Sequence, residues 1–169
     1  MPRVSIGLLV YNAENFVEEA LESILAQTFR DFELIISDNT STDRTEEICR
    51  SYAARDSRIR YSRNSTNLGS ARNYNKVVLL SSGEYFKCAA HDDIIAPDFL
   101  EKCVAVLDAD PTVVLAYTQT MLIDEHGRIV GPHNPDTKGF DSDKPHVRFG
   151  SRTSRIRPPL PFIARRHED

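Results

Sequence analysis

The sequence predicts an α/β fold in which a mostly parallel sheet is flanked by helices on both faces. Short apolar runs of strand length alternate along the chain with segments whose apolar residues recur at helical spacing. The runs are almost continuously apolar, which is typical of strands buried on both faces of a parallel sheet. With 169 residues, 40% of them hydrophobic, the chain is long enough to form a domain with a substantial core.

Two strand–helix pairs open the chain. Residues 4–11 form a nearly continuous apolar run and predict the first strand. Asn15 suits the N-cap of the helix that follows, with Glu18 three residues later as in a capping box. Residues 32–37 predict the second strand, and a helix is expected over residues 43–55. The buried helix faces are expected to carry Val17, Ala20, Leu21, Ile24 and Leu25, then Ile48, Cys49, Tyr52 and Ala53.

The alternation continues to about residue 130 and implies right-handed crossovers between parallel strands. Pro97 fits the first turn of a helix that ends at Asp110-Pro111 and buries Phe99, Leu100, Cys103, Val104 and Leu107. The other expected elements are strands at 59–62, 85–89 and 113–118, a helix at 70–80, and a hairpin of residues 121–124 and 128–130.

The pattern weakens in residues 131–169, which we expect to be irregular. Six of the nine prolines and three of the seven glycines lie there. Arginines also gather in this segment, at positions 148, 152, 155, 157, 165 and 166. A solvated loop is the ordinary reading of such a basic segment, and contact with a phosphorylated or lipid-linked acceptor is the alternative.

An acid pair at the end of a strand is the most informative feature of the chain. The run at 85–89 leads through His91 into Asp92-Asp93. Adjacent carboxylates repel each other, and a hard cation such as Mg²⁺ or Mn²⁺ compensates them while bridging to phosphates. Ligands of open α/β sheets bind outside the carboxyl ends of the strands, which is where this pair is expected.

The loops after the other strands carry polar and aromatic residues that would meet the acid pair at one edge of the sheet. A tyrosine can stack on a base, amides and carboxylates can bind base and ribose, and an arginine can bind a diphosphate. This set suits a nucleoside diphosphate. The candidate ligand-binding residues are Tyr11, Asn12, Glu14, Asp38, Asn39, Arg72, His91 and Asp92, and the candidate metal ligands are Asp93 and Asp92.

Five segments, at residues 4–12, 27–36, 41–45, 67–73 and 91–93, resemble the family 2 glycosyltransferases in order and spacing. The resemblance covers roughly residues 3–130 and implies a Rossmann-like GT-A fold for that nucleotide-sugar-binding core. It also implies metal-dependent transfer of a sugar from a nucleoside diphosphate to an acceptor hydroxyl, with inversion, in polysaccharide or cell-envelope glycan synthesis. Residues 131–169 would begin an incomplete acceptor-side region.

The resemblance assigns roles to four of the candidates. Tyr11 would lie near the base, Arg72 near the diphosphate, and Asp93 would bind the metal directly. The position of Asn39 is often an aspartate that reads the base, so a uracil-type preference is in doubt. His91 stands near a position where many relatives carry another aspartate. No match to the family's catalytic base is found, so we expect a truncated chain that binds donor and transfers sugar poorly or not at all.

Other readings of these residues remain open. Asp92-Asp93 could cap the next helix, Tyr11 could belong to the core, and Arg72 could form a surface ion pair. Asp38 and Asn39 could organise a turn, and His91 could be structural. The acids at residues 168 and 169 are a poor candidate for a general base because they end the chain.

Other functional classes are also considered. A non-catalytic nucleotide-sugar-binding module and a nucleotidyltransferase-like protein are the alternatives to a transferase. The absence of G-x-G-x-x-G and G-x-x-x-x-G-K-[ST] disfavours dinucleotide and P-loop enzymes. A net charge of −4 disfavours nucleic-acid binding.

Three cysteines without C-x-x-C spacing predict buried thiols in a reducing compartment. Neither a signal peptide nor an apolar run near 18 residues is visible. We therefore expect a cytoplasmic protein that meets the cytoplasmic face of a membrane only through other regions or the basic tail.

Overall fold

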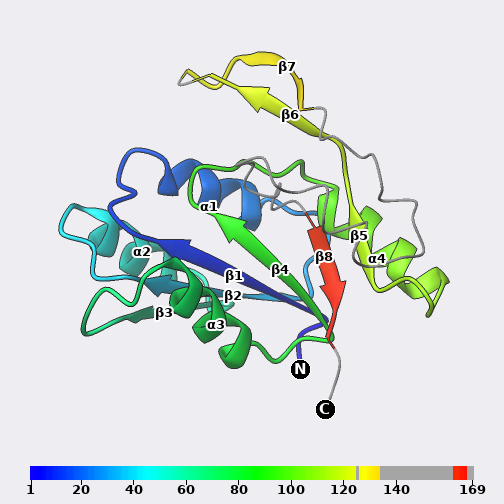
Figure 1. The fold of residues 1–169 in the computed structure, drawn as a ribbon, viewed down its shortest axis with the longest axis horizontal. Helices are drawn as coiled ribbons and strands as arrows, with labels where there is room; N and C mark the ends of the chain where they lie inside the picture. Colours follow the sequence, from blue (N-terminus) through cyan, green and yellow to red (C-terminus); the bar gives the residue numbers. More distant parts are fainter. Residues whose placement is uncertain (125, 134–161, 167–169) are drawn as a thin grey trace. The chain divides into compact units, whose positions relative to one another are not determined.

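The computed structural model describes residues 1–124, 126–133 and 162–166 (Figure 1). The chain divides into two units, one formed by Met1–Thr118 with Leu160–Asp169 and the other by Gln119–Pro159. The first unit holds all of the candidate ligand-binding residues. The arginines at 148, 152, 155 and 157 and the acids at 168 and 169 lie outside the described residues.

The first unit is built on a six-stranded sheet with the order β3-β2-β1-β4-β8-β5. β1, β2, β3 and β4 are mutually parallel where they pair, and β8 runs antiparallel to both β4 and β5. This mixed but mostly parallel sheet confirms the predicted fold class. The strands are β1 (Val4–Val10), β2 (Phe32–Asp38), β3 (Ile59–Arg63), β4 (Tyr85–Ala90), β5 (Leu115–Tyr117) and β8 (Phe162–Arg165).

Helices cover both faces of this sheet. They are α1 (Val17–Leu25), α2 (Thr45–Ala53), α3 (Ser70–Leu80) and α4 (Phe99–Ala109). Residues of α1, α2 and α4 share one large apolar cluster, and α3 contributes Val77 to a smaller one on the opposite face. The expected cap at Asn15 differs from the structure, since α1 begins two residues later and has no side-chain cap.

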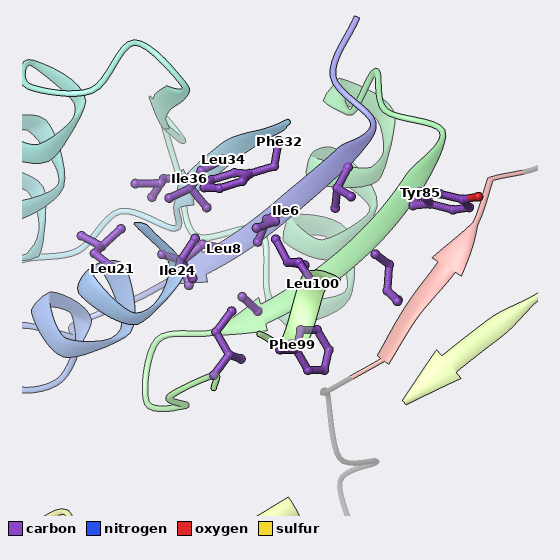
Figure 2. Close-up of a cluster of buried hydrophobic side chains, with 14 of the residues drawn as sticks. Ile6, Leu8, Leu21, Ile24, Phe32, Leu34, Ile36, Tyr85, Phe99 and Leu100 are labelled. Carbon is purple, nitrogen blue, oxygen red and sulfur yellow. The ribbon is translucent and has the colours of Figure 1, made fainter. Parts of the chain in front are cut away.

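The alternation of side chains along β1 explains the two clusters. Val4, Ile6, Leu8 and Val10 belong to the large cluster, as Figure 2 shows for Ile6 and Leu8, because side chains of a strand alternate between faces. Gly7 faces α3 instead, and a Cβ there would lie 2.7 Å from Val77 Cγ2. The glycine thus allows α3 to pack closely against the strand. Burying each large aliphatic side chain of such a core contributes about 1.5–3 kcal/mol.

Phe162–Arg165 differs from the irregular structure expected for residues 131–169, because it forms β8 within the main sheet. Arg165 secures it, with Nη1 3.0 Å from Glu84 Oε1 and Nη2 donating to Leu107 O at 2.7 Å. A four-residue strand beside a proline-rich stretch carries little local signal. Its place depends on pairing with β4, whose paired residues lie 76 to 80 positions earlier in the chain. The main sheet therefore includes residues 162–165, which lie beyond the expected core boundary at residue 130.

In the second unit, β6 (Thr120–Ile123) and β7 (Ile129–His133) form an antiparallel pair. Gly127 has a φ of +75° in the connecting turn, a conformation that glycine adopts without steric cost. The expected hairpin is confirmed. No helix in the described part of the chain has the length and apolarity needed to cross a membrane.

Candidate functional site

The carboxyl ends of β1, β2 and β4 lie at the same edge of the sheet. The register pairs Val10 with Asp38 and Leu9 with Ala90. The N–H of Asn39 then donates to Val10 O at 2.9 Å, which joins the start of the second loop to the end of β1. The loops that carry the candidates therefore begin side by side, as the sequence predicted for a parallel sheet.

Hydrogen bonds tie the loop after β1 to the loop after β2. Asn12 Oδ1 accepts from Thr42 N–H at 2.8 Å, and Glu14 Oε2 accepts from Arg44 N–H at 2.9 Å. Asn12 has a φ of 49°, in the left-handed region that asparagine tolerates. One side-chain oxygen of Asn12 and one of Glu14, both residues predicted to bind ligand, thus hold the two loops together in this structure.

Asp38 supports the second loop from inside. Its carboxylate is fully buried and accepts from Ser41 N–H at 2.8 Å and from Tyr61 Oη at 2.7 Å. Burial, followed by the hydrogen bond to Asp38, raises the pKa of Tyr61. The structure thus favours the reading of Asp38 as a residue that organises its loop, because the carboxylate presents no surface to a ligand.

Asn39 lies in a network of side-chain amides that the sequence analysis did not identify. Its Nδ2 donates to Asn67 Oδ1 at 2.7 Å, and its Oδ1 accepts from Asn64 Nδ2 at 3.1 Å. Asn64 also donates to Asn73 Oδ1 at 2.9 Å. Asn67 and Asn73 belong to the segment at 67–73 that carried the family resemblance, and this was the signal that could have found them. Asn39 is only 5% exposed.

Tyr11 and Arg72 have exposed side chains at this edge. Tyr11 is 47% exposed and so does not belong to the core. Arg72 is exposed in the first turn of α3, and it forms no ion pair with a described residue. Both side chains are therefore available to a ligand, a ring for stacking and a guanidinium for phosphate oxygens.

The acid pair is separated from the end of β4 by one residue, His91, and both aspartates are exposed residues. Asp98 occupies the N-cap position of α4, so Asp92-Asp93 do not cap that helix. Desolvation raises the pKa of Asp93 although part of the residue is exposed, and the charge of Asp92 raises it further. Lys87 and the half-buried His91 act in the opposite direction. The pair is thus an arrangement of oxygen donors whose negative charge is incompletely compensated by the protein.

This donor set fits a hard divalent cation. Carboxylate oxygens are the ligands that Mg²⁺ and Mn²⁺ prefer. Among the described residues, no group of three or more His, Cys, Asp or Glu side chains is arranged around one point. A cation here would therefore share Asp93 and Asp92 with water or with the phosphate oxygens of a ligand.

Lys87 is a buried cation that the sequence analysis treated as part of an apolar strand. It is 2% exposed, donates from Nζ to Cys88 O at 3.0 Å, and lies 5.1 Å from the centre of the Phe99 ring. Burial lowers the pKa of Lys87 to about 8. A separate apolar cavity of about 280 Å³ between α4 and β5 includes none of the candidate residues.

Comparisons with known proteins agree with this geometry. The model of the Glycosyl transferase family 2 matches residues 5–163. An uncharacterized glycosyltransferase of Methanocaldococcus jannaschii is 34% identical over 145 residues, which are 85% of this chain and 50% of that protein. The chain spans about half the length, 42–50%, of the first curated relatives that it matches.

Two solved structures extend the comparison. TarS of S. aureus (residues 1–349) in complex with UDP-GlcNAc has a TM-score of 0.60 and 28% identity, covering 63% of this chain and 31% of TarS. The mannosyltransferase PcManGT of Pyrobaculum calidifontis, in complex with GDP-Man and Mn²⁺, has a TM-score of 0.64 and 27% identity, covering 70% and 36%. The chain described here therefore belongs to glycosyltransferase family 2, with the GT-A fold.

Proposed function

We propose that this chain binds a nucleoside-diphosphate sugar together with a divalent cation held by Asp93 and Asp92. We further propose that this donor site is used to transfer the sugar to an acceptor hydroxyl. The observation that carries the proposal is the exposed acid pair at the end of β4, beside the loops after β1 and β2. Complexes of the two structural neighbours with UDP-GlcNAc, and with GDP-Man and Mn²⁺, support this donor class.

The residues of this edge would divide the work on the donor. Tyr11 would stack on the base, and Asn39 would bind its edge. Arg72 would place positive charge beside the diphosphate, where negative charge develops as the sugar leaves. A cation held by Asp93 and Asp92 would neutralise the same charge. Attack from the face opposite the diphosphate would invert the anomeric carbon.

Several expectations from the sequence remain predictions. The acceptor, the catalytic base and the activity of the isolated chain are among them, as is the cytoplasmic location. The inability to match the family's catalytic base still predicts donor binding with little or no transfer by these 169 residues. Release of nucleoside diphosphate at an efficient rate, with acceptor present, would contradict that prediction.

Calorimetry with UDP, GDP, CDP and ADP, with and without Mn²⁺, tests the proposal. We expect at least one nucleotide to bind in a Mn²⁺-dependent manner, and at 100 times its Kd to stabilise the fold by about 2.7 kcal/mol. Asp93→Asn should abolish the Mn²⁺ dependence while leaving the fold intact, since it removes one of two repelling charges.

Asp31→Asn is the matched control. Asp31 is an exposed acid just before β2, at the opposite edge of the sheet, and its carboxylate has no partner among the described residues. The Asp31→Asn variant should bind nucleotide with the same affinity as the unaltered protein. Mn²⁺-dependent affinity in Asp93→Asn within twofold of the original value would refute the metal assignment, and no nucleotide binding at all would refute the proposed function.

A further inference from the structure

Backbone N–H groups fix the orientation of the amide pair formed by Asn39 and Asn67. Leu68 N–H donates to Asn39 at 2.8 Å, and Gly69 N–H donates to Asn67 at 2.8 Å. A backbone N–H can only donate, so the side-chain atom that it reaches is the oxygen in each case. Asn39 therefore turns Nδ2 toward Asn67 Oδ1, at 2.7 Å.

The rest of the network has the same fixed polarity. The ammonium of Lys76, which can only donate, lies 2.7 Å from Asn64 Oδ1. The Nδ2 of Asn64 is therefore the group that donates to Asn39 Oδ1 at 3.1 Å. Asn73 Nδ2 in turn donates to the carbonyl of Ser37 at 3.1 Å, which can only accept. Flipping any of these amides would exchange its Oδ1 and Nδ2 and place two donors, or two acceptors, opposite each other.

This arrangement uses up the accepting capacity of Asn39. Its Oδ1 accepts from both Asn64 Nδ2 and Leu68 N–H, which fills its two lone pairs. Its Nδ2 donates one N–H to Asn67, and the described residues place no acceptor at the other. What Asn39 can offer to a ligand is one N–H donor.

An aspartate could not take the place of Asn39 in this loop without a change elsewhere. One carboxylate oxygen would still accept from Leu68 and Asn64. The other would lie where Nδ2 now lies, 2.7 Å from Asn67 Oδ1, and two acceptors would face each other without a proton between them. The presence of asparagine at position 39 and the orientation of Asn67 are therefore coupled.

We propose that Asn39 recognises the nucleobase of the donor as a hydrogen-bond donor, with Asn67 as the positioning residue that holds this polarity. The inference rests on the proposed function, because it assumes that the base binds at Asn39. The base would present an acceptor to Nδ2, a carbonyl oxygen or an unprotonated ring nitrogen. Cytosine and adenine carry such a nitrogen in the middle of their pairing edge, whereas uracil and guanine carry an N–H there.

The first test measures the coupling without a ligand. Asn39→Asp should lower the midpoint of urea unfolding, because it opposes a carboxylate to Asn67 Oδ1. In an Asn67→Ala background the same substitution should lower the midpoint by at most half as much. Asn75→Ala, an exposed position of α3, is the control background and should leave the effect unchanged. Equal shifts in all three backgrounds would overturn the assigned polarity.

The second test measures base preference by calorimetry with UDP, GDP, CDP and ADP in the presence of Mn²⁺. Asn39→Asp exchanges a donor for an acceptor, so the affinity for UDP and GDP relative to CDP and ADP should rise at least about tenfold. The double variant Asn39→Asp with Asn67→Ala should show the same shift, and it provides the measurement if the single variant is unfolded. Asn75→Ala should keep the ranking of the unaltered protein.

The outcomes separate this inference from the function on which it rests. If the unaltered protein binds a nucleotide but the ratio in Asn39→Asp changes by less than twofold, or moves toward CDP and ADP, the inference is refuted and the function stands. If no nucleotide binds the unaltered protein, both are refuted.

Discussion

Replacing Lys87 with methionine is expected to stabilise the protein at neutral pH. Lys87 is 2% exposed, and burial lowers the pKa of its ammonium from 10.5 to about 8. At about 1.4 kcal/mol per pKa unit, this difference corresponds to about 3 kcal/mol against the charged folded state. Methionine loses at least the hydrogen bond to Cys88 O and the contact with the Phe99 ring, which together contribute about 1–2 kcal/mol. The expected net gain in unfolding free energy at pH 7 is therefore at most about 1–2 kcal/mol.

The pH dependence gives the sharper test. The folded state releases the Lys87 proton near pH 8 and the unfolded state near pH 10.5, so the unfolded state binds more protons between these values. The cost of burying the charge is thus complete below pH 8 and disappears as the pH rises toward 10.5. Between pH 7 and 10 the original protein should gain about 2–3 kcal/mol relative to the methionine variant.

Urea unfolding of both proteins at pH 7, 8, 9 and 10 measures this difference. Burial raises the pKa values of Cys88 and Cys103 to about 11, so both thiols are mostly neutral in the folded proteins. Their ionisation in the unfolded state is common to both proteins and cancels in the comparison. Lys102, whose side chain is 68% exposed, is the matched control for replacement by methionine. A difference between the two proteins that stays constant within about 0.5 kcal/mol from pH 7 to 10 would refute the burial of a charged lysine.

Three further substitutions test the loops and the sheet, each by urea or thermal unfolding. Tyr61→Phe removes the hydroxyl 2.7 Å from the buried carboxylate of Asp38 and should cost about 1–3 kcal/mol; no loss would mean that the carboxylate is hydrated. Gly83→Ala would place a Cβ 2.7 Å from Ser5 N and should cost about 1–3 kcal/mol, so an unchanged midpoint would contradict this close approach. Thr40 has a φ of 71°, and Thr40→Gly should remove the steric cost of this left-handed conformation, about 1–2 kcal/mol. Glycine in turn loses more conformational entropy on folding, which costs about 0.5–1 kcal/mol. Glycine also loses the hydrogen bond from Thr40 Oγ1 to Asn64 O at 3.3 Å, which contributes about 0.5–1.5 kcal/mol. The thermal midpoint should therefore change little, and a large fall would show that this hydrogen bond outweighs the relief of the backbone.

Some features of the site could be predicted from the sequence and others could not. The acid pair was identified because two adjacent carboxylates at a strand end are unusual in any setting. That Asn12 and Glu14 bind a ligand stays a prediction, but the sequence did not indicate that Asn12 Oδ1 and Glu14 Oε2 accept from backbone N–H groups of the neighbouring loop. A polar side chain near a strand end has the same local pattern whether it binds a ligand or another loop. The distinction depends on which loop lies beside it.

Local periodicity was sufficient to determine the order of strands and helices from residue 4 to residue 124, because apolar residues recur at spacings that differ between the two. It also determined that Asp92-Asp93 follow a buried strand. Tertiary structure alone decided three things: β8 joins the sheet beside β4, Lys87 is buried, and Asn39 is held by Asn67 as a donor. Each depends on residues between 12 and about 80 positions away in the chain. Hydrogen bonding and burial over such separations leave no periodic trace in the sequence.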